Sequence, residues 1–229
     1  MRGFAGTGCV LSCSRWRAAL LGGCLCLAAA AAQAQAASNT SINAQLLVAA
    51  RQADGPAVQA ALARGAAPDS RNRLGKTVLL MAAERGDRAM AGAALGAGAD
   101  PNLASVQQVT PLMAACYGGD EALVKTLLAA GARTDPQDHL HKPAIVYAAG
   151  QGHAEVVALL LGVGVPVDAV YANGLTALMW AAGQGATATV KVLLARGAHT
   201  DLRDDRGLTA LDMARQGGHA AVVALLQMR

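Results

Sequence analysis

The sequence is poor in aromatic residues, which make up 3% of its 229 residues and include a single phenylalanine. Its hydrophobic content nevertheless reaches 54%, because alanine supplies much of it. A core of small side chains fills space only when the backbones around it come close together. The composition therefore favours helices that pack at short range.

An excess of charge of one sign is also missing once the N-terminus is set aside. The net charge is +4, but Arg2, Arg15 and Arg17 all precede the first acidic residue, Asp54. Without these three arginines, 16 basic residues face 15 acidic ones. Proteins that bind nucleic acids carry a concentrated positive surface, so this balance argues against a nucleic-acid partner.

Cysteine is nearly absent beyond residue 26. Cys9, Cys13, Cys24 and Cys26 lie near the N-terminus, and Cys116 is the one cysteine that follows them. A single thiol cannot form an internal disulfide. Packing alone must therefore hold the rest of the chain together.

The N-terminal region lacks an apolar run of the roughly 20 residues that span a bilayer. The run from Ala18 to Ala32 has 15 residues, follows a basic segment that ends at Arg17, and precedes the small-residue stretch AQAQAA. This order is typical of a secretory signal peptide. The sequence predicts a signal peptide over residues 1–36, cleaved after Ala34 or Ala36, and a short linker over residues 37–43.

Two alternatives to simple cleavage stay open. The apolar run could remain as an uncleaved anchor, or the segment LGGC, from Leu21 to Cys24, could act like the lipobox at which bacterial lipoproteins are cut and acylated. All three readings predict an exported protein. We expect it in the bacterial periplasm, with no membrane insertion of the mature domain.

A 33-residue period runs through the rest of the chain. Each period begins at a residue suited to start a helix and carries glycines where two helices would end. The three series are Thr77, Thr110, Pro143, Thr176 and Thr209; Gly86, Gly119, Gly152, Gly185 and Gly218; and Gly65, Gly98, Gly131, Gly164 and Gly197. They divide residues 44–229 into six units, near 44–76, 77–109, 110–142, 143–175, 176–208 and 209–229.

Each unit predicts two helices and a loop. Thr110 followed by Pro111 is typical of a helix start, because the N–H that proline lacks is not needed in the first turn. Apolar residues then recur at helical spacing, and a second helix follows from Asp120. A stretch with turn chemistry, such as Asp201 to Leu208, leads to the next threonine.

The motif T-[PA]-L-x-x-A-A-x-x-G, followed by LL-x-x-G-A and a D-x-x-G-x-T turn, resembles the ankyrin repeat across residues 44–229. The resemblance implies an all-α repeat solenoid of about six helix-turn-helix units with short hairpin or loop fingers. It further implies a concave surface that binds other proteins, and it implies no catalytic chemistry.

Several residues depart from the ankyrin pattern. Gln108 and His141 stand where other fingers have glycine, and a positive φ is unfavourable for them. We therefore expect these two fingers to bend differently from the rest. Ala53 replaces the first helix-ending glycine, and Arg215 and Gln227 are polar residues of the last unit, as expected of end caps that face water.

The histidines have plain structural interpretations. His153 and His219 follow a helix-ending glycine and are predicted to cap the next helix, whereas His199 has no evident partner. His139 and His141 could present two imidazoles, but two ligands make a poor zinc site. We expect no metal and no cofactor.

Cys116 is a candidate nucleophile, and Tyr147 and Trp180 are candidate contacts. Cys116 shares its repeat position with Ala83, so a buried packing role is the favoured interpretation. Tyr147 and Trp180 replace smaller residues at one position of the first helix. They either fill space between helices or contact a partner, and the sequence does not decide between the two.

The sequence thus predicts a noncatalytic, monomeric protein–protein interaction module that binds, protects or inhibits an envelope protein. Alternatives are a membrane-anchored lipoprotein scaffold and a cysteine-dependent enzyme. The candidate contact residues lie on the fingers and at the ends of the first helices: Arg71, Arg73, Lys76, Glu84, Arg85, Gln107, Tyr117, His139, Lys142, Gln151, Tyr171, Asn173, Gln184, Arg203, Asp205 and Arg206.

Overall fold

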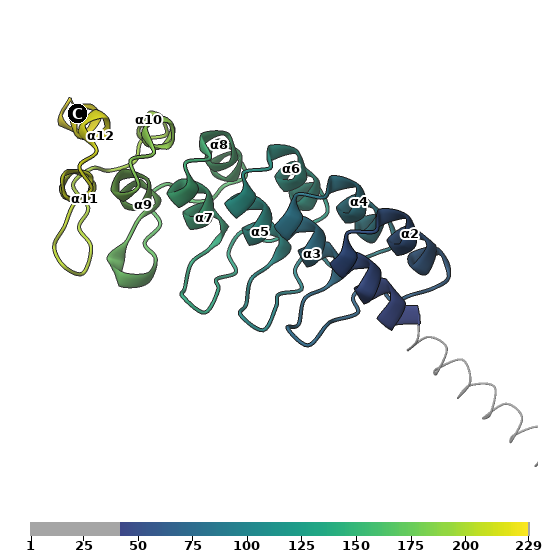
Figure 1. Cartoon of the computed structure of the whole chain (residues 1–229). Helices are drawn as coiled ribbons and strands as arrows, with labels where there is room; N and C mark the ends of the chain where they lie inside the picture. Colours follow the sequence, from purple (N-terminus) through teal and green to yellow (C-terminus); the bar gives the residue numbers. More distant parts are fainter. Residues whose placement is uncertain (1–41, 229) are drawn as a thin grey trace, which may run out of the picture.

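The computed structural model describes residues 42–228, which form a row of stacked helix pairs (Figure 1). Residues 42–52 are helical. The helices that follow are α2 (Gly55–Ala63), α3 (Val78–Arg85), α4 (Arg88–Gly96), α5 (Pro111–Gly118), α6 (Glu121–Ala129), α7 (Ala144–Gln151), α8 (Ala154–Gly162), the 3-10 helix η1 (Ala172–Gly174), α9 (Ala177–Gly183), α10 (Thr187–Ala195), α11 (Ala210–Gln216) and α12 (Ala220–Gln227). Residues 42–228 contain no strand. The predicted all-α repeat solenoid is confirmed.

The first helix of each pair begins as its sequence predicts. Thr110, the N-cap of α5, accepts a hydrogen bond from the N–H of Met113 at 3.3 Å, and the threonines before α3 and α9 do the same. Thr209 forms a capping box with Asp212 at the start of α11. Pro143 begins α7 without a side-chain bond, so this helix relies on packing for its position.

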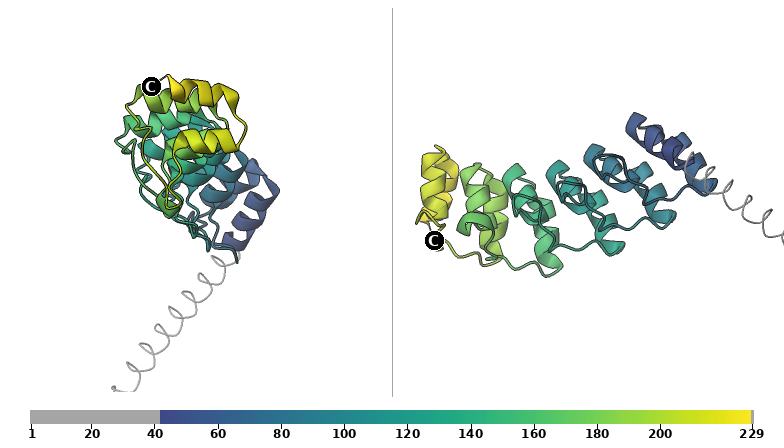
Figure 2. Two further views of the ribbon diagram at one scale, coloured as in Figure 1. Left: turned by 90° about the vertical axis from the view of Figure 1, so that its left-hand side faces the viewer. Right: turned by 90° about the horizontal axis from the view of Figure 1, so that it is seen from below.

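Small residues bring the inner helices, which are the first helices of the pairs, close together. Ala82 and Ala83 of α3 are 0% and 3% exposed, and Ala181 and Ala182 of α9 are fully buried. Each inner helix packs extensively on the next one, whereas successive outer helices touch less. The closer packing of the inner helices bends the row toward them. The view from below in Figure 2 shows that the row is curved.

Five loops, which we call fingers 1 to 5, project beside the inner helices (Figure 1). They comprise residues 71–76, 104–109, 137–142, 170–175 and 203–208. In finger 3, the N–H of Asp138 donates to the carbonyl of Lys142 at 3.2 Å and the N–H of His141 donates to the carbonyl of Asp138 at 2.9 Å. The other fingers are closed by the equivalent two bonds.

The prediction that fingers 2 and 3 bend differently is wrong. Gln108 and His141 have φ values of 62° and 56°, close to the 71° and 79° of Gly75 and Gly207. A left-handed conformation costs a non-glycine residue about 1–2 kcal/mol. The hydrogen bonds that close the turn contribute about 0.5–1.5 kcal/mol each and outweigh that cost.

Candidate protein-binding surface

A row of hollows lies between the fingers and the inner helices. One hollow of about 300 Å³ is lined by Glu84, Val109, Met113, Ala114, Tyr117 and Tyr147. A second of about 190 Å³ continues past Tyr117 and Tyr147 to Trp180. A third of about 320 Å³ lies between α9 and α11. Together they form a groove along the concave side, which we call the inner groove.

The middle of the inner groove is aromatic. The rings of Tyr117 and Tyr147 meet edge to face, with centroids 6.1 Å apart and an interplanar angle of 77°. The ammonium group of Lys142 lies 4.5 Å from the centroid of the Trp180 ring, in a cation–π contact. Tyr117 is 57% exposed, so this cluster offers apolar surface to a partner.

Tyr147 is fixed by finger 3. Its hydroxyl donates a hydrogen bond to the carboxylate of Asp138, which is 7% exposed. Burial, together with the hydrogen bond and charge of Asp138, raises the pKa of Tyr147 well above its ordinary value. The sequence did not decide whether Tyr147 and Trp180 fill space between helices or offer contact surface. They do both, because they are partly buried and also line the groove.

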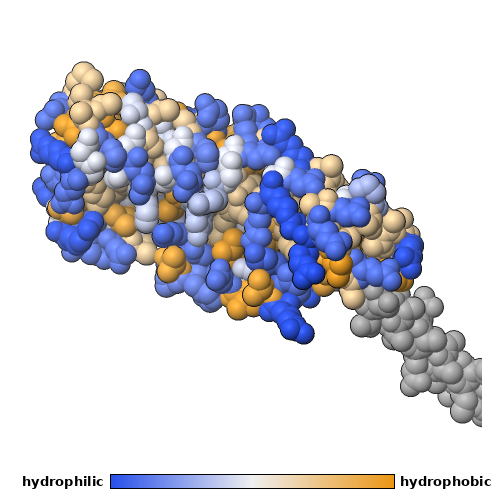
Figure 3. Space-filling view, in the orientation of Figure 1, coloured by the Kyte–Doolittle hydropathy of each residue, from blue (hydrophilic) through white to orange (hydrophobic). Residues whose placement is uncertain are grey.

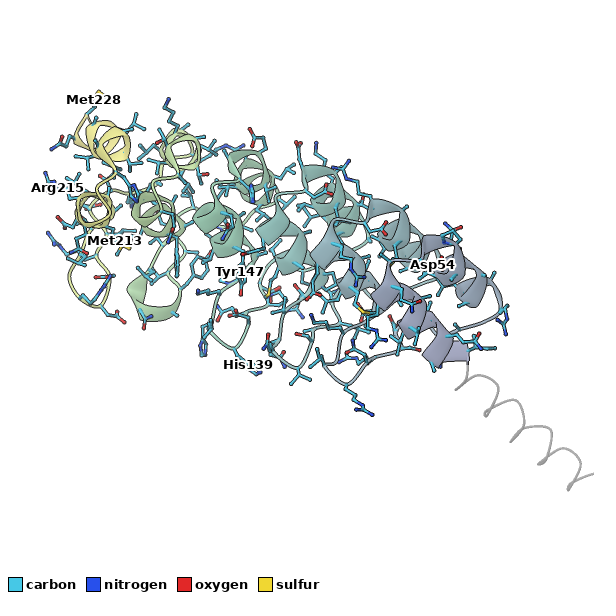
Figure 4. The ribbon with its side chains drawn as sticks, in the orientation of Figure 1. Asp54, His139, Tyr147, Met213, Arg215 and Met228 are labelled. Carbon is cyan, nitrogen blue, oxygen red and sulfur yellow. The ribbon has the colours of Figure 1, made fainter. Side chains whose placement is uncertain are left out.

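Most of the predicted finger residues are exposed, and several bind the neighbouring finger or their own loop. Arg71 donates to the carbonyl of Ala104 at 3.2 Å, and His139 Nε2 lies 2.7 Å from the carbonyl of Val106. Figure 4 shows His139 at the finger edge and Tyr147 on α7 above it. The predicted residues that are exposed on the fingers are Arg71, Arg73, Gln107, His139, Asn173, Arg203, Asp205 and Arg206.

Three predicted residues have structural partners instead of free side chains. Arg85 donates to the carbonyls of Ala50 and Arg51, which ties α3 to the helix of residues 42–52. Lys76 and Glu84 form an ion pair at 2.7 Å. Of the other predicted residues, Gln151 and Gln184 line the inner groove beside Trp180, whereas Tyr171 is partly buried in finger 4.

The exposed apolar residues at the finger tips were missed from the sequence. Leu74, Val106 and Leu140 are 61%, 62% and 63% exposed. Figure 3 shows apolar patches along this edge among hydrophilic residues. The signal was an apolar residue in a turn, where neither helical nor strand periodicity accounts for it.

The prediction that His153 and His219 cap helices is wrong, because neither side chain makes a capping bond, whereas Asp87 and Asp120 at the same repeat position do. His153 Nε2 lies 3.0 Å from the carbonyl of Tyr117, near the end of the inner helix of the preceding unit. His219 makes the equivalent contact 3.0 Å from a carbonyl of α9. Each of these two rings therefore reaches back to the preceding unit and joins two repeats.

His199 also has a partner, contrary to the sequence-based prediction. Its N–H donates to Asp168 Oδ1 at 2.9 Å, and its Nδ1 lies 3.5 Å from Asp168 Oδ2. In the same way, Asp69 Oδ1 accepts the backbone N–H of Asp100 at 2.9 Å, and Asn102 Oδ1 accepts that of Arg133 at 2.8 Å. This series of side chains connects the outer loops of successive repeats.

Cys116 is fully buried, and burial raises the pKa of its thiol to about 12. A thiol in this environment is a poor nucleophile. Among residues 42–228, no three His, Cys, Asp or Glu side chains come together in a way that would hold a metal ion. Within the same residues, no helix is long and apolar enough to cross a bilayer.

Comparison with known proteins identifies the repeats. A family model described as "Ankyrin repeats (3 copies)" matches residues 46–138 and again residues 145–229. No curated protein matches the chain.

Proposed function

Because the chain belongs to the ankyrin-repeat family and is therefore a protein-interaction module, we propose that it binds one folded envelope protein in the bacterial periplasm. The inner groove and the fingers provide the contact surface. Binding there protects, inhibits or scaffolds the partner without chemistry at the site.

The aromatic centre of the groove carries this proposal. Tyr117, Tyr147 and Trp180 lie on the successive inner helices α5, α7 and α9 and line connected hollows. Aromatic side chains dominate the energetics of protein interfaces. Contacts with Asp138 and Lys142 hold two of these rings in place. A preformed surface loses little conformational entropy when a partner binds.

Export is proposed from residues 1–36, which lie outside the described residues. Support comes from the order of basic, apolar and small-residue segments. The intact mass of the protein recovered from a periplasmic fraction tests this. Processing after Ala34 or Ala36 supports a free periplasmic protein, and an acylated Cys24 supports the lipoprotein alternative. Recovery from the cytoplasm with residue 1 intact would contradict export.

A binding experiment with paired variants tests the interaction. The tagged protein, Tyr117→Ala and Lys191→Ala are each incubated with periplasmic extract, and bound proteins are quantified by mass spectrometry. Lys191 lies exposed on the outer helix α10, away from the groove. We expect a stoichiometric partner that is retained by Lys191→Ala and lost by Tyr117→Ala. Equal recovery by both variants, or no stoichiometric partner, would overturn the proposal.

A further inference from the structure

Finger 4 lacks the side chain that organises the other fingers. At the first turn position, fingers 1, 2, 3 and 5 have Asn72, Ser105, Asp138 and Asp204. Asn72, Asp138 and Asp204 each accept two backbone N–H groups of their own loop, and Ser105 accepts one. In finger 3, for example, Asp138 Oδ1 accepts the N–H groups of Leu140 and Lys142 at 2.9 and 2.8 Å. Such local bonds are the reason that Asx residues favour turns.

Tyr171 takes this position in finger 4 and cannot accept those bonds. Its side chain packs against the core instead, and burial raises its pKa to about 12. The loop forms the 3-10 helix η1, with Asn173 and Gly174 at φ values of 62° and 75°. Finger 4 is therefore the finger that departs from the others, and the cause is a tyrosine in place of a turn-forming side chain.

The departure interrupts a series of hydrogen bonds between neighbouring fingers. Val106 donates to Leu74 at 3.0 Å, His139 to Gln107 at 3.3 Å, and Asp205 to Asn173 at 3.1 Å, all between backbone groups. The bond that would join Ala172 N–H to the carbonyl of Leu140 does not form in the described chain.

A pocket of about 270 Å³ lies at this interruption. We call it the finger 3–4 pocket. Its lining consists of Leu140, His141, Lys142, Tyr171, Ala172, Asn173, Leu175 and Trp180. The volume lies just below the range of about 300–1,000 Å³ that is usual for small-molecule sites. It suits one or two side chains of a partner better than a cofactor.

The charge of the pocket favours an acidic group. Within residues 42–228, no carboxylate oxygen lies within 4 Å of Lys142 Nζ, and the Trp180 ring holds the ammonium group at the pocket wall. Asp138 is buried and bonded to Tyr147 and to its own loop. Asp205 lies on the far side of finger 4, against Gly174.

We propose that the finger 3–4 pocket takes an extended segment of the partner that carries an aspartate or glutamate next to an apolar side chain. The carboxylate pairs with Lys142, and the apolar side chain packs on Leu175 and Trp180. The backbone of the segment bonds to the carbonyl of Leu140 and the N–H of Ala172, which restores the interrupted series. This inference rests on the function proposed above and names the chemistry of the segment that the partner presents.

The test uses blocked tripeptides and NMR. Acetyl-Leu-Glu-Leu-amide and acetyl-Leu-Gln-Leu-amide are titrated into the 15N-labelled full chain. We expect binding in the millimolar range, with shifts centred on the Ala172 amide and the Trp180 indole. The glutamate peptide should bind about fivefold more tightly, as expected for one partly desolvated ion pair worth about 1 kcal/mol. Equal affinity of the two peptides, or shifts elsewhere, would overturn the inference.

Two variants sharpen the experiment. Tyr171→Asp supplies the missing turn acceptor and should restore the bond from Ala172 N–H to the carbonyl of Leu140. Ala172 N–H should then become protected from hydrogen exchange, and peptide binding should disappear. Lys142→Gln should remove the preference for glutamate while the fold is kept, which the unchanged amide spectrum outside fingers 3 and 4 verifies. Binding of the glutamate peptide by both variants at the original strength contradicts the proposal.

The two proposals fail separately. If the tripeptides do not bind but the chain still captures a partner in a Tyr117-dependent way, the interaction function stands and the finger 3–4 pocket is not its acidic-segment site. If the peptides bind as expected but no protein partner is recovered from the periplasm, the pocket chemistry stands and the proposed function falls.

Discussion

At the scale of single residues, the position in the repeat decides the backbone conformation more strongly than residue preference does. Ala53, Gln108 and His141 stand where other units have glycine, and all three adopt a positive φ, between 56° and 62°. The sequence-based prediction weighed the φ preference of each residue alone. It missed that the closing bonds of the turn leave no other conformation, so these residues are strained.

Gln108→Gly should stabilise the protein. Relief of the left-handed strain gains about 1–2 kcal/mol, and the extra freedom of glycine in the unfolded chain costs about 0.5–1 kcal/mol. We expect a net increase of about 0.5–1 kcal/mol in the free energy of unfolding. Urea denaturation followed by circular dichroism measures it.

Gln107→Gly is the matched control in the same finger. Gln107 does not have a positive φ, so only the entropic cost remains and this variant should be destabilised. A loss of stability in both variants would show that the turn is not strained at Gln108.

Cys116 is fully buried, so we expect its thiol to be unreactive in the folded protein. Its pKa of about 12 leaves almost no thiolate at pH 8. We expect a disulfide reagent such as DTNB to modify the native protein only as fast as the protein opens, and the urea-unfolded protein within seconds. Rapid labelling of the native protein near neutral pH would reopen the cysteine-dependent enzyme considered from the sequence.

At the scale of helices and loops, the residue that precedes an outer helix serves different purposes in different repeats. Asp87 and Asp120 cap the helix that follows them, whereas His153 and His219 reach back to the preceding unit. The helix starts were predictable, because a cap is a local feature. The contacts of the histidines were not, because they join residues 36 positions apart and depend on how two repeats stack.

The histidine contact predicts a difference between two glycines with the same backbone conformation. Gly86 and Gly119 have φ values of 69° and 72°. A Cβ at residue 86 would meet Asp120 at 3.8 Å, but a Cβ at residue 119 would lie 2.4 Å from His153 Nδ1. Gly86→Ala should cost about 1–2 kcal/mol from strain alone, and Gly119→Ala should cost clearly more.

A double-mutant cycle isolates the cause. In a His153→Ala background the excess cost of Gly119→Ala should vanish, because the ring that it displaces is gone. Thermal or urea unfolding of the four proteins measures this coupling. Additive effects would mean that His153 does not lie against Gly119 in solution.

Asp120 should contribute more to stability than Asp87, and the difference should depend on pH. Both cap an outer helix, and each replacement by alanine should cost about 0.5–2 kcal/mol. Asp120 also accepts hydrogen bonds from Arg88 Nε in the preceding unit, at 2.9 and 2.8 Å. The bond from Arg88 lowers the pKa of Asp120 below its ordinary value.

A lowered pKa in the folded state means that the stabilising interaction is complete above the unfolded pKa and is lost as the pH falls through the folded pKa. The excess cost of Asp120→Ala over Asp87→Ala should therefore be present at pH 7 and shrink between about pH 5 and pH 2. Urea titrations across this range check it. An excess that is unchanged at pH 2 would rule out the ion pair as its source.

The candidate site was predicted less well than the helices. Asn173 and Gln107 were found as finger residues because loops are read from turn chemistry. Tyr171 was predicted as a contact residue, which stays a prediction, but its second effect was missed, namely that it replaces a turn acceptor. The sequence contains that signal at one repeat position, where four fingers have Asn, Ser or Asp. It becomes visible only when the fingers are compared with one another.

At the scale of the whole molecule, the fold followed from the period because each repeat buries its helices mainly against its neighbours. In such a stack each repeat contacts only its neighbours, so the fold can be predicted one repeat at a time. Its stability is approximately the sum of the stabilities of the repeats and of their interfaces. The groove was harder to predict. Its hollows depend on which side chains of neighbouring units overlap, and the partly buried positions of Tyr147 and Trp180 arise from that overlap.

The same one-dimensional stacking predicts how the cost of a cavity varies along the row. Leu160 and Leu226 occupy equivalent positions in α8 and α12, and they are 0% and 5% exposed. Outer helix α8 packs between α6 and α10, whereas among the described residues α12 has a neighbouring repeat on one side. Leu160→Ala should cost about 2–5 kcal/mol, because two interfaces surround the cavity, and Leu226→Ala should cost less. Leu193→Ala, at the equivalent internal position in α10, serves as the control and should match Leu160→Ala. Equal losses for Leu160 and Leu226 in urea denaturation would mean that the last repeat is not an end cap.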